Sequence, residues 1–219
     1  SHWRTTTKDN VTTLYGYSES ARIADPDQPT HIFQWMIERS IDHKGNAIEY
    51  HYKREDNENV EGSVFESPRL SAGKALTNLY LREVCYGTTT PFISPTGTFP
   101  GDTHFRLVFD YGEHTDEIPA YTPNSTWPVR NDPFSSFRAG FEIRTRRLCQ
   151  RIIMFHYFQD LAEIPFPVKM ISLGYEHRPE LTLLKNVTLS GWDNHEEPGS
   201  FPPVEFSYSE ASVGQKSYT

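Results

Sequence analysis

The chain has 219 residues, with 21 Lys and Arg against 29 Asp and Glu, and this length allows one large domain or two small ones. The net charge of −8 excludes strong nonspecific binding to nucleic acid, which needs a basic surface to release counterions. No apolar run reaches the roughly 18 residues of a membrane-spanning helix, so we expect no direct membrane insertion. Aromatic residues make up 14% of the chain, and 16 prolines and 13 glycines divide it, which favours an all-β protein with many turns.

The chain opens on the polar stretch SHWRTTTKDN, which has neither an initiator methionine nor a secretory signal. We therefore expect a fragment of a longer protein. We assign no internal domain boundary within residues 1–219.

The first clear hairpin signal is the stretch SIDHKGNAIEYHYK, residues 40–53. Asp42 to Asn46 is predicted to form the turn, with Gly45 and Asn46 at the positive φ angles that these residue types tolerate. Apolar and polar residues then alternate with the period of a strand. The predicted faces are Ile48, Tyr50 and Tyr52 on one side, and Glu49, His51 and Lys53 on the other. We expect Tyr50 and Tyr52 to be packing residues, and the polar face to be wet.

Two further pairs of strands follow the same pattern. TNLYLREVCYG precedes THFRLVFDYG, and LTLLKNVTLSGW precedes PVEFSYSE. We expect the alternating apolar residues of the second strands to face the core, namely Phe105, Leu107, Phe109 and Tyr111 in one and Val204, Phe206 and Tyr208 in the other. The predicted fold class is therefore mainly β, with long antiparallel hairpins that form a curved sheet.

The longest strand candidate is RAGFEIRTRRLCQRIIMFHYF, residues 138–158, and its length favours a wide curved sheet over a compact sandwich. Its arginines, Arg144, Arg146, Arg147 and Arg151, occupy both faces. We expect them to pair with acidic groups across neighbouring strands. The alternative is a phosphate-binding face. Helix is expected only as a turn or two around residues 72–79.

No familiar catalytic or metal-binding pattern is evident in the sequence. The nine histidines lack HxH or HExxH spacing, and the acidic stretch DYGEHTDEIP lacks the spacing of a calcium loop. Cys85 and Cys149 are expected to be free core thiols. The stretches NSTW and NHEEPG do not provide the Ser-Thr-Ser strand and Glu-x-Glu pair of an ADP-ribosyltransferase. We expect no enzyme activity, no cofactor and no metal.

Several phrases together resemble one family. They include WRTTTKDNVTTLYG, DHKGNAIEYHY, FRLVFDYGEH, DPFSSFRAGFEIRTRRLC and FPPVEFSYSE. In this order they resemble the N-terminal domain shared by the Salmonella virulence plasmid B-protein family and the B subunits of bacterial insecticidal toxin complexes, the Tc toxins. The resemblance covers essentially the whole chain. The core DxxGNxxxYxY also resembles a single Tyr-Asp repeat of the Rhs type.

This resemblance implies a structural role in virulence. Tc B and C subunits form a hollow, Rhs-like β-sheet shell around the cytotoxic C-terminal region of the C subunit, and a β-propeller in B docks on the pore-forming A subunit. The present segment would supply shell strands. The implied partners are the C subunit and, through the rest of the parent chain, the A subunit. The implied location is secreted or extracellular, with a stage in the bacterial cytoplasm before release. In the plasmid-encoded proteins the ADP-ribosyltransferase is a separate C-terminal domain.

Two other functions stay open at this point. One is a carbohydrate-binding β-module that uses exposed aromatic residues such as Trp127 or Trp192. The other is an enzyme, either a glycosidase or a transferase, with an unrecognised site. An enzyme would show a pocket with convergent carboxylates or histidines.

Overall fold

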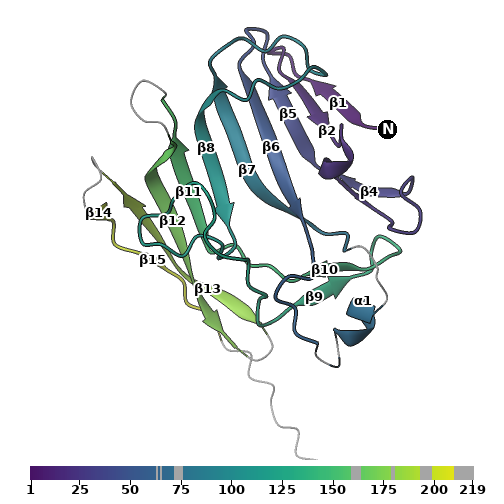
Figure 1. Cartoon of the computed structure of the whole chain (residues 1–219), viewed down its shortest axis with the longest axis vertical. Helices are drawn as coiled ribbons and strands as arrows, with labels where there is room; N and C mark the ends of the chain where they lie inside the picture. The colour runs from purple at the N-terminus through teal and green to yellow at the C-terminus, as the bar shows by residue number, and fades with distance from the viewer. Residues whose placement is uncertain are drawn as a thin grey trace, which may run out of the picture.

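One antiparallel sheet of eleven strands dominates the computed structural model (Figure 1), which describes residues 1–62, 64, 66–71, 76–158, 164–178, 181–192 and 199–209. Across the sheet the strands are β1 (Trp3–Thr6), β2 (Thr12–Tyr15), β5 (Ile37–Ile41), β6 (Ala47–Arg54), β7 (Leu79–Thr88), β8 (Thr103–Asp110), β11 (Arg151–His156), β12 (Phe166–His177), β13 (Thr182–Gly191) and β14 (Gly199–Ser200). The last strand, β15 (Val204–Glu205), also pairs with β13. The sheet is therefore a long meander in which most neighbours in space are neighbours in sequence.

Smaller elements lie beside the main sheet. Two separate hairpins are β3 (Arg22–Ala24) with β4 (Ile32–Trp35) and β9 (Phe134–Ser136) with β10 (Ile143–Thr145). Among the residues that the structure describes, helix is limited to the 3₁₀ turn η1 (Glu19–Ala21) and the single turn α1 (Ser67–Ser71). Figure 1 shows β9, β10 and α1 gathered together at one side of the molecule. In the part of the chain that the structure describes, no helix is long and apolar enough to cross a membrane.

The predicted hairpins are confirmed, and with them the mainly β fold class. β5 pairs with β6 across residues 42–46, β7 pairs with β8, and β13 pairs with β15. The helix predicted around residues 72–79 is wrong at its end, because Leu79 already belongs to β7. Residues 72–75 of that prediction lie outside the described residues.

The single long strand predicted over residues 138–158 is wrong. The segment forms β10 and β11, and residues 146–150 between them belong to no strand. Arg146 and Arg147 are adjacent, yet they are only 0% and 2% exposed. Because successive side chains of a strand point to opposite faces, two neighbours buried this deeply do not fit a strand with one wet face.

The hydrophobic core lies between one face of the sheet and the long connections that cross it. Under the segment after β8, Val108, Ile153 and Phe155 are 7%, 0% and 0% exposed, and Tyr121 packs against them. The loop between β7 and β8 covers the neighbouring part of this face, where the packed residues are Ile41, Ala47, Phe92 and Phe99. The covered face is therefore packed by loops, whereas a β-sandwich would use a second sheet.

The opposite face carries a continuous set of apolar side chains that remain partly exposed. We term this set the open face. Its members come from five adjacent strands and are Ile48, Tyr50, Val84, Tyr86, Phe105, Leu107, Phe109, Ile152, Met154 and Ile171. None of the ten is buried.

The predicted alternation is confirmed, but the buried face was assigned to the wrong side. Phe105 was expected in the core and is half-buried, whereas Val108 and Asp110 are 7% and 1% exposed. Phe109 is also half-buried, but it packs against the buried core cluster of Tyr80, Tyr111 and Trp127. Tyr111 is buried as expected. The other expected core residues, Val204, Phe206 and Tyr208, are 61%, 38% and 44% exposed.

The physical reason is that the polar groups on the covered face have partners. Asp110 accepts a hydrogen bond from the Arg151 guanidinium at 2.7 Å, and Glu49 lies 2.8 Å from Arg39. Buried charges are tolerated when they are paired and hydrogen-bonded. Amphipathic alternation alone therefore does not indicate which face the loops cover.

Two Phe→Ala substitutions test this assignment. We expect Phe155→Ala to lower the free energy of unfolding by about 3–5 kcal/mol, because it leaves a cavity in the core. Phe105→Ala on the open face should lose mainly its aromatic contacts, about 0.5–1.5 kcal/mol. Urea unfolding followed by circular dichroism measures both. Equal losses, or a larger loss for Phe105→Ala, would contradict the assignment of the two faces.

Candidate functional site

The predicted turn residues form a hydrogen-bonded loop between β5 and β6. The Asp42 carboxylate accepts hydrogen bonds from the Lys44 and Asn46 amides at 2.8 and 2.9 Å, and from the Asn46 side chain at 2.7 Å. These bonds, the Asn46 side chain first, lower the pKa of Asp42. Gly45 has the expected positive φ, +87°. Asn46 does not, because among the described residues only Asn10 and Asn59 are non-glycines with positive φ. Asn46 acts through its side chain instead.

Gly45 is also the point where the turn meets the loop between β7 and β8. A Cβ on Gly45 would lie 2.8 Å from Pro91 Cβ and 2.9 Å from Phe92 N. The Phe92 amide donates to the Gly45 carbonyl at 2.9 Å, and Phe92 belongs to the core cluster with Ile41 and Ala47. The turn therefore anchors the loop that covers this end of the sheet.

Tyr50 and Tyr52, the two predicted packing residues, are half-buried. The Tyr52 hydroxyl donates to the Ile37 carbonyl at 2.7 Å, and burial raises its pKa to about 12. Burial also raises the pKa of Tyr50. His51 between them has a side chain that is 45% exposed, with Nε2 3.1 Å from Glu49. The hydrogen bond to Glu49 raises the pKa of His51.

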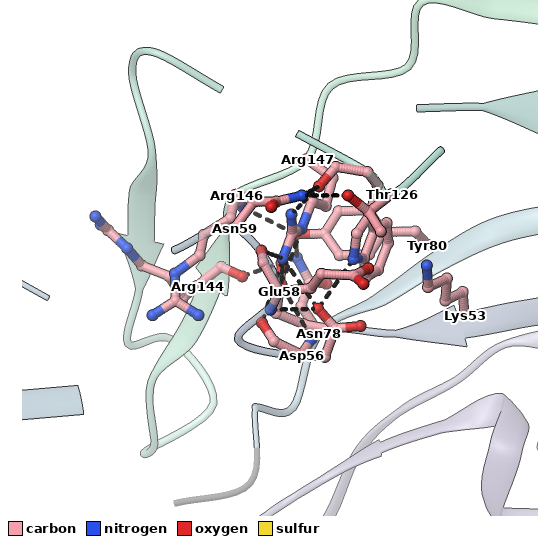
Figure 2. A network of polar contacts seen from close by, with 12 residues as sticks. Lys53, Asp56, Glu58, Asn59, Asn78, Tyr80, Thr126, Arg144, Arg146 and Arg147 are labelled. Carbon is pink, nitrogen blue, oxygen red and sulfur yellow. Dashed lines mark hydrogen bonds and ion pairs between the residues drawn. The ribbon is translucent and has the colours of Figure 1, made fainter. Parts of the chain in front are cut away.

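A cluster of buried charges lies at the end of β6 (Figure 2). The side chains of Arg147 and Glu55 are both 0% exposed, with Arg147 Nη2 2.8 Å from Glu55 Oε1. Arg147 also lies 3.1 Å from the Asp56 carboxylate and donates to the carbonyls of Trp127 and Glu58 at 2.8 and 2.9 Å. These partners come from two chain segments, residues 55–58 and Trp127, and they offset the desolvation of the guanidinium.

Trp127 forms part of the same cluster and is 0% exposed. Lys53 Nζ and Arg147 Cζ lie 3.7 and 4.2 Å from its ring centroid, which are cation–π distances. Its Nε1 donates to Asp56 at 2.9 Å. Lys53, expected in water, instead reaches this ring and Glu113, 2.7 Å away. Trp127 is therefore too deeply buried to contact a sugar as the carbohydrate-binding hypothesis requires, and Trp192 is half-buried.

A second group of charges is linked to the first through Tyr80. Arg146 Nη2 lies 2.6 Å from Glu66 Oε2, and Arg144 holds the other oxygen of Glu66. Burial alone would raise the pKa of Glu66, but hydrogen bonds from Arg146 and Arg144 outweigh it and lower this pKa. The Tyr80 hydroxyl donates to Glu55 at 2.8 Å and accepts the Arg146 amide at 2.9 Å.

The predicted pairing of the arginine run with acidic groups is confirmed, since all four guanidinium groups contact carboxylates. This disfavours the phosphate-binding alternative. Only Arg151 pairs with a neighbouring strand, through Asp110 of β8. Glu55 and Glu66 were missed as partners because they lie 92 and 80 residues before Arg147 and Arg146. The one available signal was the position of Glu55 directly after an alternating strand.

Within the described residues, no group of three or more His, Cys, Asp or Glu side chains could hold a metal ion. Cys85 and Cys149 are free thiols, as expected. Burial raises their pKa values to about 12 and 11. Because the thiolate is the nucleophilic form, these cysteines are poor nucleophiles at neutral pH.

Cross-strand pairing arranges the open face in rows. Tyr86, Phe105 and His156 are successive partners on β7, β8 and β11. The rings of Tyr86 and Phe105 stack with centroids 5.1 Å apart, and Phe105 meets His156 edge-on at 5.1 Å. Leu107 and Met154 are partners in the next row. Each opposed pair adds about 0.2–1 kcal/mol, so the rows stiffen a continuous apolar surface.

Comparison with known proteins gives one consistent match. Residues 1–158 match the family described as Salmonella virulence plasmid 65kDa B protein. The chain is 36% identical over 190 residues to the mono(ADP-ribosyl)transferase SpvB of Salmonella typhimurium. The aligned region is 83% of this chain and 32% of that protein. SpvB of Salmonella choleraesuis matches to the same extent. The chain thus spans about a third of the length of these curated relatives.

Solved structures with a similar fold fall into two groups. The N-terminal domain of the effector SpvB from Salmonella typhimurium strain LT2 has a TM-score of 0.81 and 35% identity, over 88% of this chain and 61% of that one. The TcdB2-TccC3 structure has a TM-score of 0.86 and 32% identity, over 96% of this chain and 11% of that one. The Photorhabdus luminescens Tc holotoxin pore has a TM-score of 0.84 and 32% identity, over 94% and 10%.

The first prediction for this site concerns the turn. We expect Gly45→Ala to lower the free energy of unfolding by about 1–3 kcal/mol, because it forces a side chain into a positive-φ conformation and against Pro91. Gly62→Ala is the matched control, since a Cβ on Gly62 meets nothing within 4 Å and its φ is not positive. Chemical denaturation of both variants provides the measurement. A Gly45→Ala protein as stable as the control would show that the turn does not anchor the loop.

The second prediction concerns the buried charges. Arg147→Met should lower the free energy of unfolding by about 3–5 kcal/mol, because it leaves Glu55 buried without its cation. Lys185→Met should change it by less than about 1 kcal/mol, because Lys185 and its partner Glu176 are 51% and 38% exposed. Thermal and urea unfolding report both values. A loss below 1 kcal/mol for Arg147→Met would contradict a structural role for the pair.

Proposed function

The chain belongs to the family of the Salmonella virulence plasmid 65kDa B protein, and on that premise we propose that it forms part of a β-shell that encloses and delivers a cytotoxic C-terminal cargo. A structural role in a toxin complex agrees with the similarity to the TcdB2-TccC3 and SpvB N-terminal folds. In this proposal the segment is one part of a much larger wall, because the similar region is about a tenth of the TcdB2-TccC3 chain.

The observation that carries the proposal is the open face. Ten apolar side chains from β6, β7, β8, β11 and β12 lie next to one another and remain partly exposed. Continuous apolar surface of this kind marks an interaction site in a soluble protein. A cargo chain held unfolded presents apolar side chains in no fixed geometry, and a broad apolar wall accommodates such a chain without specific hydrogen bonds.

The proposed binding partners follow from the same shell role. We propose that the segment assembles with a cargo-bearing, Rhs-type C subunit and, through the rest of the parent chain, with a pore-forming A subunit. It would act after secretion, in an extracellular toxin complex, following a stage in the bacterial cytoplasm. Neither nucleic-acid binding nor direct membrane insertion forms part of this role.

We further propose that the segment is not an enzyme. The curated relatives are mono(ADP-ribosyl)transferases, but this chain corresponds to only 32% of their length. Its sequence lacks the Ser-Thr-Ser strand and the Glu-x-Glu pair of that activity. Transferase activity in a parent protein would therefore lie in another segment.

A charge placed on the open face tests the shell. Leu107→Lys and Met154→Lys, made separately in the parent B-type chain, alter cross-strand partners. Both side chains are partly exposed, so lysine can extend toward water without unfolding the sheet. We expect the cargo of the co-expressed C subunit to be digested at least tenfold faster by added protease, because the charged wall binds the unfolded chain less well.

The matched control is Ile118→Lys, which makes the same chemical change at a loop residue that is 44% exposed and lies outside the open face. It should leave the cargo as protected as in the unaltered complex. Circular dichroism verifies that all three variants are folded. Equal cargo protection in all of them would contradict the proposal that this face lines the cargo compartment.

A further inference from the structure

A polar cavity of about 500 Å³ lies where β5 and β6 separate. The two strands pair from Ile41 and Ala47 as far as Arg39 and Glu49. Beyond that point the Tyr52 hydroxyl reaches the Ile37 carbonyl, and the 3₁₀ turn η1 packs beside β6. The cavity is within the usual size range of small-ligand pockets, about 300–1,000 Å³.

Glu38 is the central feature of this cavity. It is the extra residue of a β-bulge, since Leu14 pairs with Arg39 and Tyr15 pairs with Ile37. Bulges redirect side chains out of the regular ladder, and Glu38 lines the cavity. The residue is only 7% exposed.

The Glu38 carboxylate forms no ion pair within the described part of the chain. Its hydrogen-bond partner there is the Ser18 amide, which donates to Oε2 at 2.8 Å, and no described Lys, Arg or His lies within ion-pair distance. An ionised carboxylate has about four acceptor positions, and a buried charge is costly without a partner. The site therefore favours a cation from outside the chain.

The other carboxylates of the cavity already have partners. Glu49 lies 2.8 Å from Arg39 and 3.1 Å from His51. Glu83 accepts a hydrogen bond from the Tyr121 hydroxyl at 2.6 Å. A divalent metal ion would need several free oxygen ligands, which this arrangement does not offer. A single positive group that needs one carboxylate fits better.

Two aromatic side chains complete the cavity. Tyr50 and Tyr52 line it, and the hydrogen bond to Ile37 fixes the Tyr52 hydroxyl. The faces of aromatic rings attract organic cations. A carboxylate together with tyrosine rings therefore suits an organic cation, whereas a sugar would need more free hydrogen-bonding groups.

We propose that this cavity binds one guanidinium or ammonium group, with Glu38 as its counter-ion and Tyr50 and Tyr52 as its walls. The group would come either from a basic side chain of a partner polypeptide or from a free amine. Arg82, which is exposed and lines the same cavity, repels the ligand and weakens its binding. The proposal does not depend on the shell function.

Titration calorimetry of the full chain with N-acetyl-arginine amide tests this site. The wild-type chain should bind the probe saturably, and Glu38→Gln should weaken binding at least tenfold. This change keeps the size of the side chain and an acceptor for the Ser18 amide but removes the charge. N-acetyl-citrulline amide, a neutral analogue of the same shape, should not bind. Arg82→Gln should tighten binding of the arginine probe.

Glu19→Gln is the matched control, because it removes the same charge from an exposed residue of the adjacent turn η1. Its affinity should stay within twofold of the wild type. No saturable binding, equal binding by Glu38→Gln, or equal binding of the citrulline probe would each overturn the proposal. A pentapeptide with a central arginine then identifies the source. Binding tenfold tighter than the single residue indicates a polypeptide ligand, and equal binding indicates a free cation.

Discussion

The buried contact between Arg147 and Glu55 is the interaction on which the covered side of the molecule depends. Both side chains are 0% exposed, so each charge is stable there only because the other is present. The same guanidinium donates to the carbonyls of Trp127 and Glu58, in connections that have no strand partners of their own. Buried backbone groups of such connections need hydrogen bonds. Arg147 therefore satisfies the backbone groups of these loops and holds the loops against the sheet, in the place where a β-sandwich would have a second sheet.

Other arginines repeat this arrangement across the covered face. Each pairs with a carboxylate and also donates to the carbonyl of a loop that crosses the sheet. Arg39 pairs with Glu49 and donates to the Gly97 carbonyl at 2.6 Å. Arg151 pairs with Asp110 and donates to the Asp116 carbonyl at 3.2 Å. The recurrence explains why the face with more polar residues is the covered one: its charges hold the loops in place.

The sequence predicted the local features well, because their causes are local. Alternation marked the strands, and the Asp42–Asn46 stretch marked the turn, where the Asp42 side chain closes the loop within a few residues. The covered face could not be predicted in the same way, since it depends on contacts such as Arg147 with Glu55, 92 residues apart. The same contacts interrupt the long strand expected over residues 138–158. The cavity beside Glu38 arises from a bulge, which alternation does not show.

The two unlike faces fit the proposed wall segment better than they fit a self-contained domain. Loops and paired arginines complete one face, so that side needs no further partner. The open face has aromatic and aliphatic rows without buried members. The apolar area that these ten partly exposed side chains leave in contact with water is unfavourable, at about 25 cal/mol per Å². The fold is nevertheless similar both in the SpvB N-terminal domain and in TcdB2-TccC3, where the similar region covers 61% and 11% of the respective chains. In this chain the sheet is covered on one side and apolar on the other, so we expect the rest of the parent protein to supply what the open face contacts.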